Sequence, residues 1–294
     1  MGERRILEND KIRVEIDDLG AELSRIYDKE KEREVLWDAD PRYWGRHACI
    51  LFPIVGALNQ DTYHYEGKEY TMKQHGFARN RPFQLEKQTA DSVTHKLVWD
   101  EETYAVYPFR FALYVTHTVS EKKIQVSWRV ENLQEKELYF SIGGHPAFRV
   151  PVLQDTAFED YSLVFQCKDD EPRCIRINEP GLALPESEMT MRLQDGRKKV
   201  EKDMFQEGVY IFEHGQIESA GFLMPDGSPY LTLECKGFPY FGVWAAKGAP
   251  FICLEPWYGR TDAVGFSGTL EEREGGNCLK AGQTFEASYQ IMLA

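Results

Sequence analysis

Two histidines and one glutamate stand in settings that suit acid–base chemistry. His145 follows two glycines and precedes a proline in FSIGGHPAFRVP, and Glu255 ends an apolar strand in FICLEPWYG. His75 lies beside a glycine in KQHGFARNRPF, with Gln74 and Arg79 nearby. A proton donor and a proton acceptor are the groups needed for proton transfer on a neutral polar substrate. We therefore expect these places, 70 and then 110 residues apart, to meet in the folded chain.

The glycines and the proline around His145 indicate a special backbone. Glycine lets a ligand or another chain segment approach closely, and proline interrupts the hydrogen-bonded ladder of a strand. We expect the two glycines to thin the floor of a cleft so that a ligand reaches His145. Pro146 is expected to hold that edge open.

Each of these residues also has an ordinary explanation. A histidine after glycines can cap a turn, a glutamate can end a strand, and an arginine can pair with a surface acid. The remaining histidines lack comparable settings and are interpreted as structural or solvated: His47, His64, His95, His117 and His214. Only the combination favours chemistry.

Several other kinds of site are not supported by motifs. The chain has no G-x-S-x-G and no Walker pattern. Two histidines and a glutamate are also a metal-ligand set, but the H-x-H and H-E-x-x-H spacings are absent. We predict no metal and no organic cofactor.

Composition narrows the class of protein. The 294 residues include 35 Lys and Arg against 48 Asp and Glu, a net charge of -13, which disfavours nucleic acid and anionic membranes as partners. The charged N-terminal segment does not resemble a signal peptide, so we expect a soluble, cytoplasmic protein. The six cysteines form no C-x-x-C pair and are interpreted as reduced thiols. No oligomeric state is predicted.

Alternation of apolar and polar residues predicts strands along most of the chain. It is clear at residues 12–16, 111–115, 124–130 and 285–293, the last of which is expected to close a sheet. Turns are predicted at EGK (66–68), at DD (169–170) and at PDG (225–227), and short helices only near 40–44 and 201–205. With no linker or repeat, we predict a single all-β domain over 1–294, a large antiparallel β-sandwich.

Three segments together resemble the aldose 1-epimerase (galactose mutarotase-like) superfamily, and most closely its LacX-like branch. They are LFPIVGALNQDTYHYEGKEYTMKQHGFARNRPF, SIGGHPAF and PYFGVWAAKGAPFICLEPWYGRTD. The similarity extends from about residue 5 to the closing GTLEEREGG and LKAGQTFEASYQI segments. HGFAR, GGHPAF and EPW in this order and spacing are specific to the family, whereas each alone is a weak signal.

The resemblance implies a mutarotase-like supersandwich with an open cleft that binds a sugar. It implies that Glu255 is the base that takes the anomeric proton and that His145 is the acid that protonates the ring oxygen. His75 is expected to bind and orient the sugar, with Gln74 and Arg79 beside it. A carboxylate near the imidazole would favour its charged form.

Aromatic residues beside these motifs are candidate walls of the cleft. Trp257, directly after Glu255-Pro256, and Phe148 are expected to stack on the sugar, and Trp244 is a weaker candidate.

The chain also departs from the family pattern. Some relatives carry an arginine where this chain has Ala57 and an aspartate near Gly208. These differences leave a non-catalytic sugar-binding or sugar-sensing protein as an alternative. Arg79 keeps a hexose-6-phosphate mutarotase open, and a glycoside hydrolase would need a second carboxylate beside Glu255.

Overall fold

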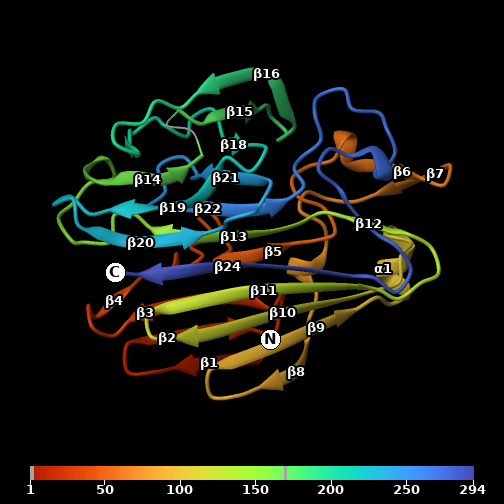
Figure 1. The fold of residues 1–294 in the computed structure, drawn as a ribbon, viewed down its shortest axis with the longest axis horizontal. Helices are drawn as coiled ribbons and strands as arrows, with labels where there is room; N and C mark the ends of the chain where they lie inside the picture. Colours follow the sequence, from red (N-terminus) through yellow and green to blue (C-terminus); the bar gives the residue numbers. More distant parts are fainter. Residues whose placement is uncertain (1–2, 169–170) are drawn as a thin grey trace.

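The fold is built from antiparallel strands with little helix (Figure 1). The computed structural model describes residues 3–168 and 171–294. Its α-helix is α1 (Glu101–Val106), and its short 3₁₀ helices are η1 (Asn59–Asp61), η2 (Ala78–Asn80), η3 (Phe158–Asp160) and η4 (Leu270–Glu272). Within the described residues, no helix is long and apolar enough to cross a membrane.

Two large sheets dominate the molecule. The nine-stranded sheet contains, in spatial order, β17 (Arg197–Lys199), β14 (Ser162–Cys167), β19 (Ile217–Leu223), β20 (Pro229–Glu234), β24 (Thr284–Leu293), β11 (Lys123–Asn132), β10 (Phe111–Ser120), β9 (Ser92–Val98) and β8 (Gln84–Gln88). The seven-stranded sheet contains β16 (Ala183–Thr190), β15 (Arg173–Ile177), β18 (Tyr210–Phe212), β21 (Tyr240–Trp244), β22 (Phe251–Tyr258), β13 (Ile142–Arg149) and β5 (Ala48–Leu51).

Three smaller sheets complete the structure. The four-stranded one contains β1 (Arg4–Glu8), β2 (Ile12–Asp17), β3 (Glu22–Asp28) and β4 (Arg33–Glu34). The two-stranded ones pair β6 (Thr62–Tyr65) with β7 (Lys68–Thr71) and β12 (Leu138–Phe140) with β23 (Asn277–Leu279).

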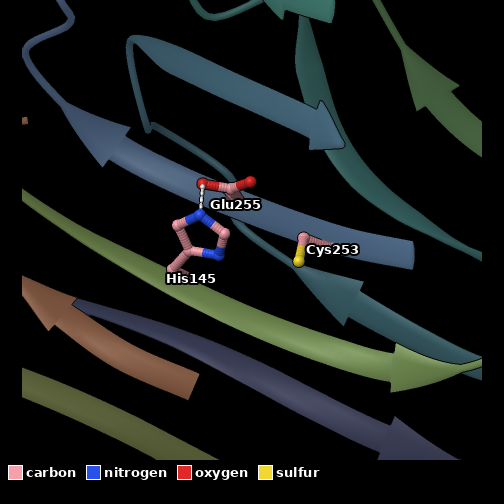
Figure 2. Close-up of side chains that lie close together, drawn as sticks. All are labelled: His145, Cys253 and Glu255. Carbon is pink, nitrogen blue, oxygen red and sulfur yellow. Dashed lines mark ion pairs between the residues drawn. The ribbon is translucent and has the colours of Figure 1, made fainter. Parts of the chain in front are cut away.

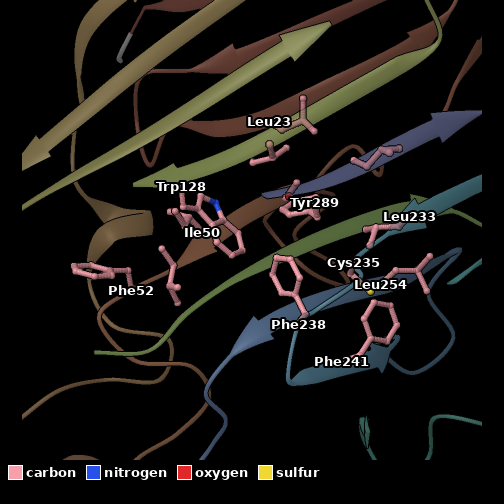
Figure 3. Packing of buried hydrophobic residues seen from close by; sticks show 14 of the residues in the cluster. Leu23, Ile50, Phe52, Trp128, Leu233, Cys235, Phe238, Phe241, Leu254 and Tyr289 are labelled. Atoms are coloured by element: carbon pink, nitrogen blue, oxygen red, sulfur yellow. The ribbon is translucent and has the colours of Figure 1, made fainter. Parts of the chain in front are cut away.

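The main core lies between the two large sheets (Figure 3). Phe148 of β13 packs against Phe222 of β19, with ring centres 6.2 Å apart. Phe165 of β14 packs against Phe212 of β18 at 5.7 Å. Such face-to-face packing of antiparallel sheets is the sandwich that the sequence predicts.

Most of the predicted local structure is confirmed. The four alternating segments form β2, β10, β11 and β24, and turns stand at 66–67 and 225–227. The turn expected at 169–170 lies outside the described residues. Within the described residues the six cysteines form no disulfide, and four of them are buried: Cys49, Cys174, Cys235 and Cys253.

Three local expectations need correction. Residues 41–43 and 202–207 form turns and not helices, and the α-helix lies at Glu101–Val106 instead. Asp100 starts this helix by accepting a hydrogen bond from the Thr103 amide, and the Thr103 hydroxyl accepts one from the Asp100 amide. The last strand, β24, lies inside its sheet between β20 and β11 and so does not close an edge.

Both faces of β13 and β22 are covered by other residues. One face packs in the main core, and the other carries His145 and Glu255. On β22, Leu254 belongs to the main core, whereas Cys253 and Trp257 belong to apolar clusters on the opposite face. Because side chains alternate along a strand, Glu255 shares the face of Cys253 and Trp257, and His145 faces away from the core residue Phe148. The second face of the seven-stranded sheet therefore carries the acid–base residues.

Candidate active site

His145 and Glu255 form an adjacent pair on neighbouring strands. The His145 Nε2 and Glu255 Oε2 atoms are 3.2 Å apart, and both side chains are buried (Figure 2). β13 pairs with β22 at Gly143–Trp257 and again at Ala147–Cys253, so His145 and Glu255 oppose each other midway. The two groups meet in mid-strand, although the sequence placed Glu255 at a strand end.

The glycines before His145 make room for two aromatic rings on opposite faces of the sheet. A Cβ on Gly143 would lie 2.4 Å from Trp257 Cδ1, and one on Gly242 would lie 2.5 Å from the far end of the same indole. The Trp257 ring therefore lies across the sheet surface beside Glu255. A Cβ on Gly144 would lie 3.0 Å from the Tyr289 ring. The expectation that both glycines thin the cleft floor for a ligand is therefore wrong.

His75 is held beside the pair by its own loop. Its amide donates to the Gly56 carbonyl at 2.8 Å, and the Gly56 amide donates to its Nδ1 at 3.1 Å. Its backbone has φ 67°, a left-handed conformation that needs such support. The His75 ring stands perpendicular to that of His145, with centres 5.6 Å apart. Because Nδ1 accepts a hydrogen bond, the proton of the neutral ring is on Nε2.

Arg79 supplies positive charge to the same cavity. Its guanidinium donates to the Gln74 carbonyl at 2.7 Å, which connects the two predicted residues. Among the described residues, its buried Nε has no hydrogen-bond partner. The Gln74 side chain is exposed at the mouth of the cavity. Both residues are therefore placed to contact a polar ligand.

An aromatic cage surrounds the His145 ring. The Trp44 indole stacks on the imidazole with ring centres 4.6 Å apart and planes 25° apart. Trp244 meets the same ring edge-on at 5.6 Å and 82°. Trp244 is only a weak candidate from its sequence position, and Trp44 is not predicted because it lies far along the chain from the three motifs.

Burial opposes charge on both members of the pair. Burial lowers the pKa of His145 to about 3, and the charge of Arg79 acts in the same direction. Burial also raises the pKa of Glu255 well above its usual range, an effect opposed by the nearby Trp257 indole N–H. The predicted influence of the carboxylate on the imidazole thus competes with desolvation.

The pair is best described as sharing one proton. Glu255 as a carboxylic acid can face a neutral His145, or the carboxylate can face the imidazolium, and the two forms differ by proton transfer across the 3.2 Å contact. Burial, then His145 and Arg79, lower the pKa of His75 well below its usual value, so His75 is neutral. It is therefore a hydrogen-bond donor through Nε2.

His145, Cys253 and Glu255 also form a possible metal-ligand group within the described part of the chain (Figure 2). Their ligand atoms lie within 4.8 Å of one another. Without a metal, burial and the nearby Glu255 raise the pKa of the Cys253 thiol well above its usual value, so this group is a thiol and not a thiolate. The 3.2 Å contact between His145 and Glu255 fits a proton donor and a proton acceptor. That no metal takes part stays a prediction.

The site opens into a cavity of about 260 Å³. Its lining includes the predicted residues Gln74, His75, Arg79, His145, Glu255 and Trp257. This volume suits a single small polar ring with apolar faces.

Phe148 is the exception among the predicted site residues. It is fully buried in the main core and does not belong to the cavity lining. The reason is strand parity, since Phe148 is three residues from His145 and so points to the opposite face. The prediction that Phe148 contacts the ligand is therefore wrong.

The far wall of the cavity is apolar. Val55, Ile177, Val209 and Ile211 line it, and Thr261 adds a hydroxyl that already donates to the Gly181 carbonyl at 2.6 Å. Sequence reasoning missed these residues because alternating apolar residues are equally typical of a core. Ala57 and Gly208, where some relatives carry charged residues, lie outside the lining.

Comparison with known proteins gives a consistent result. The sequence model of the family described as aldose 1-epimerase matches residues 4–172. Protein LacX, encoded on a plasmid of Lactococcus lactis subsp. lactis, is 31% identical over 98% of both chains.

Two solved structures are similar over nearly the whole chain. The galactose mutarotase related enzyme from Lactobacillus acidophilus has a TM-score of 0.93 and 30% identity, covering 99% of this chain and 97% of its own. A galactose mutarotase-like protein from Lactobacillus casei has a TM-score of 0.89 and 30% identity, covering 99% and 100%.

Proposed function

This chain belongs to the aldose 1-epimerase family, and we propose that it interconverts the α and β anomers of a hexose or hexose derivative. Family membership supports an isomerase that acts on a sugar. The observation that carries the finer proposal is the buried contact between His145 and Glu255 in the cavity. The proposed reaction uses no cofactor.

The spacing of the pair matches the chemistry of a cyclic sugar. The anomeric hydroxyl and the ring oxygen are bonded to the same carbon, so the base and the acid must be close neighbours. A 3.2 Å contact meets that need. Hydrolysis of a glycoside instead uses two carboxyl groups at least about 5 Å apart. Glu255 is the sole carboxylate among the described residues of the lining, which argues against a hydrolase.

The proton count also balances. The Glu255 carboxylate takes the proton from the anomeric hydroxyl while the His145 imidazolium protonates the ring oxygen, and the C1–O5 bond breaks. The pair is left as a carboxylic acid and a neutral imidazole, and the sugar is an open-chain aldehyde. Rotation about C1–C2 and the reverse transfers close the ring on the other face. Both proton forms of the pair are therefore used in each turnover.

The other predicted residues serve binding. His75 Nε2–H and the Arg79 guanidinium donate to sugar hydroxyls. Trp257 offers its ring face and a buried indole N–H, which lies near Glu255 but makes no hydrogen bond of normal geometry within the described residues. A ligand hydroxyl would satisfy this group and so gain affinity.

The first test is anomer exchange measured by NMR in weakly buffered neutral solution. We expect the wild-type protein to accelerate exchange of at least one sugar among glucose, galactose and their 6-phosphates. Glu255→Gln, which keeps the size of the side chain, should lower the rate by roughly 10²- to 10⁴-fold because it removes the base. Sugar binding and the fold should remain.

The exposed Glu271 supplies a matched control, since Glu271→Gln makes the same chemical change away from the cavity. Its exchange rate should equal that of the wild type. Substantial exchange by Glu255→Gln would refute the assignment of the base.

Two related functions are separated by the same experiment. Binding without faster exchange would favour a non-catalytic sugar-binding protein. A preference for the 6-phosphates would favour a hexose-6-phosphate mutarotase, for which Arg79 with its unpaired Nε is the supporting observation.

A further inference from the structure

The stacking of Trp44 on His145 has a consequence for the acid of the pair. Their planes are 25° apart, so the indole presents its π face to the imidazole. The face of an aromatic ring is electronegative and attracts a cation lying over it. A neutral imidazole gains less from this contact than an imidazolium does.

Trp44 is held in place by its own surroundings. Its amide donates to the Asp40 carbonyl at 3.0 Å, and the Trp37 indole donates to the Trp44 carbonyl at 2.9 Å. Phe251 and Trp244 pack against its ring, each with centres 5.9 Å away. Backbone hydrogen bonds and ring packing therefore hold the indole in place. The indole can in turn hold the imidazole ring in the orientation that faces Glu255.

The imidazolium has few other stabilising neighbours. The titratable and charged groups around His145 come from β22, from β5, from the loop leading into η2 and from η2 itself: Glu255, Cys253, Cys49, His75 and Arg79. The positive charge of Arg79 disfavours a second positive charge on His145. His75 is neutral and the thiols are protonated, so they do not offset this repulsion. Glu255 supplies the one negative charge in this set.

We propose that Trp44 is a positioning residue that stabilises the imidazolium form of His145 and so prepares the carboxylate–imidazolium form of the pair. Ring opening starts from this form, whereas burial favours the uncharged one. The indole face thereby offsets part of the desolvation of the acid. This inference rests on the proposed function for its role in turnover, but not for its effect on His145.

Two substitutions grade the effect. Trp44→Leu removes the π face, and Trp44→Phe keeps a smaller one. We expect Trp44→Leu to lower kcat by roughly 2- to 30-fold, the range of a cation–π contact, with a smaller change in KM. As pH rises, Trp44→Leu should lose the activity that needs protonated His145 about 0.4 to 1.5 pH units below the pH at which the wild type loses it. Trp44→Phe should fall between Trp44→Leu and the wild type.

A second readout does not depend on catalysis. The ring ¹⁵N signals of His145, assigned by their loss in His145→Gln, report where the proton resides as pH changes. We expect the pKa of His145 to fall in Trp44→Leu and to recover partly in Trp44→Phe. Trp99→Leu is the control, because Trp99 packs on Tyr104 and Arg110 outside the cavity. It should leave the His145 signals unchanged.

The outcomes are separable. Trp44 also lines the cavity. A lower rate in Trp44→Leu with an unchanged pH profile and unchanged His145 titration would therefore mean a structural or sugar-contacting role and overturn the inference. If the wild type accelerates no sugar, the proposed function fails alone. The ¹⁵N titration then still decides, since a downward shift supports the role of Trp44 and identical curves exclude it.

Discussion

At the scale of single residues, His75 combines two roles in one ring. Nδ1 accepts the Gly56 amide at 3.1 Å, and Nε2–H is available to a ligand. Asparagine places an oxygen near the Nδ1 position and tolerates the left-handed backbone that His75 adopts. We predict that His75→Asn keeps the loop folded but raises the KM for the sugar about tenfold, the loss of one hydrogen bond to a ligand.

Alanine at the same position separates these roles. His75→Ala leaves the Gly56 amide unpaired and strains the backbone, so it should also lower the free energy of unfolding by about 1–3 kcal/mol. KM and urea unfolding measured for both variants check this, with exposed His64→Ala as control. Equal destabilisation by Asn and Ala would contradict the role of Nδ1.

Residue types and spacing were enough to predict that His75, His145 and Glu255 come together. The motifs around His75, His145 and Glu255 combine glycine or proline with a titratable side chain, and the chain brings all three to one cavity. Trp44 could not be found in this way. It stacks on His145 from a loop about 100 residues away in sequence, and DPRYW carries no signal of that contact.

At the scale of elements, the consecutive glycines of β13 test whether successive residues face opposite sides of the sheet. Gly143 lies under the Trp257 indole in the cavity, and Gly144 lies against Tyr289 in the core. Gly143→Ala should displace Trp257 and lower sugar affinity and exchange rate severalfold, because the contact of 2.4 Å is too short to tolerate.

Gly144→Ala should act on stability alone. Overpacking against Tyr289 predicts a loss of about 1–3 kcal/mol in unfolding free energy, with KM close to that of wild type. Sugar titrations and urea unfolding of the two variants test the difference. The same pattern of effects for both would mean that the two faces are not separated as described.

The elements themselves were largely predictable, but their faces were not. Alternation marks β2, β10, β11 and β24, since one side of each is less buried than the other. In β13 and β22 nearly every residue is buried, so apolar and polar residues do not alternate. The sequence therefore does not indicate which face each side chain points to. This is why Phe148 was assigned to the cavity while it lies in the core.

At the scale of the whole molecule, buried histidines tie stability to pH. His117 of β10 is 2% exposed, and burial lowers its pKa to about 3. In the unfolded chain its pKa is about 6.5, so between these values the unfolded state binds one more proton. Stability from this residue is complete above about pH 6.5 and is lost as pH falls toward 3, by about 1.4 kcal/mol per pH unit.

Urea unfolding between pH 7 and pH 4.5 tests this linkage. His117→Gln has no titrating ring, so its unfolding free energy should fall less steeply as the solution is acidified. The exposed Gln88 does not titrate and provides the control, so Gln88→Asn should show the wild-type slope. An unchanged slope in His117→Gln would mean that the folded protein accepts the proton on His117.

The position of β24 inside the nine-stranded sheet also governs how the chain is made. β24 pairs with β11 on one side and β20 on the other, so it joins the two halves of that sheet (Figure 1). Until residues 284–293 leave the ribosome, β11 and β20 each present an open edge. Open edges template pairing between chains. A polypeptide that still lacks residues 284–293 is therefore prone to aggregate through these two edges, and chaperones that cover strand edges would act on it.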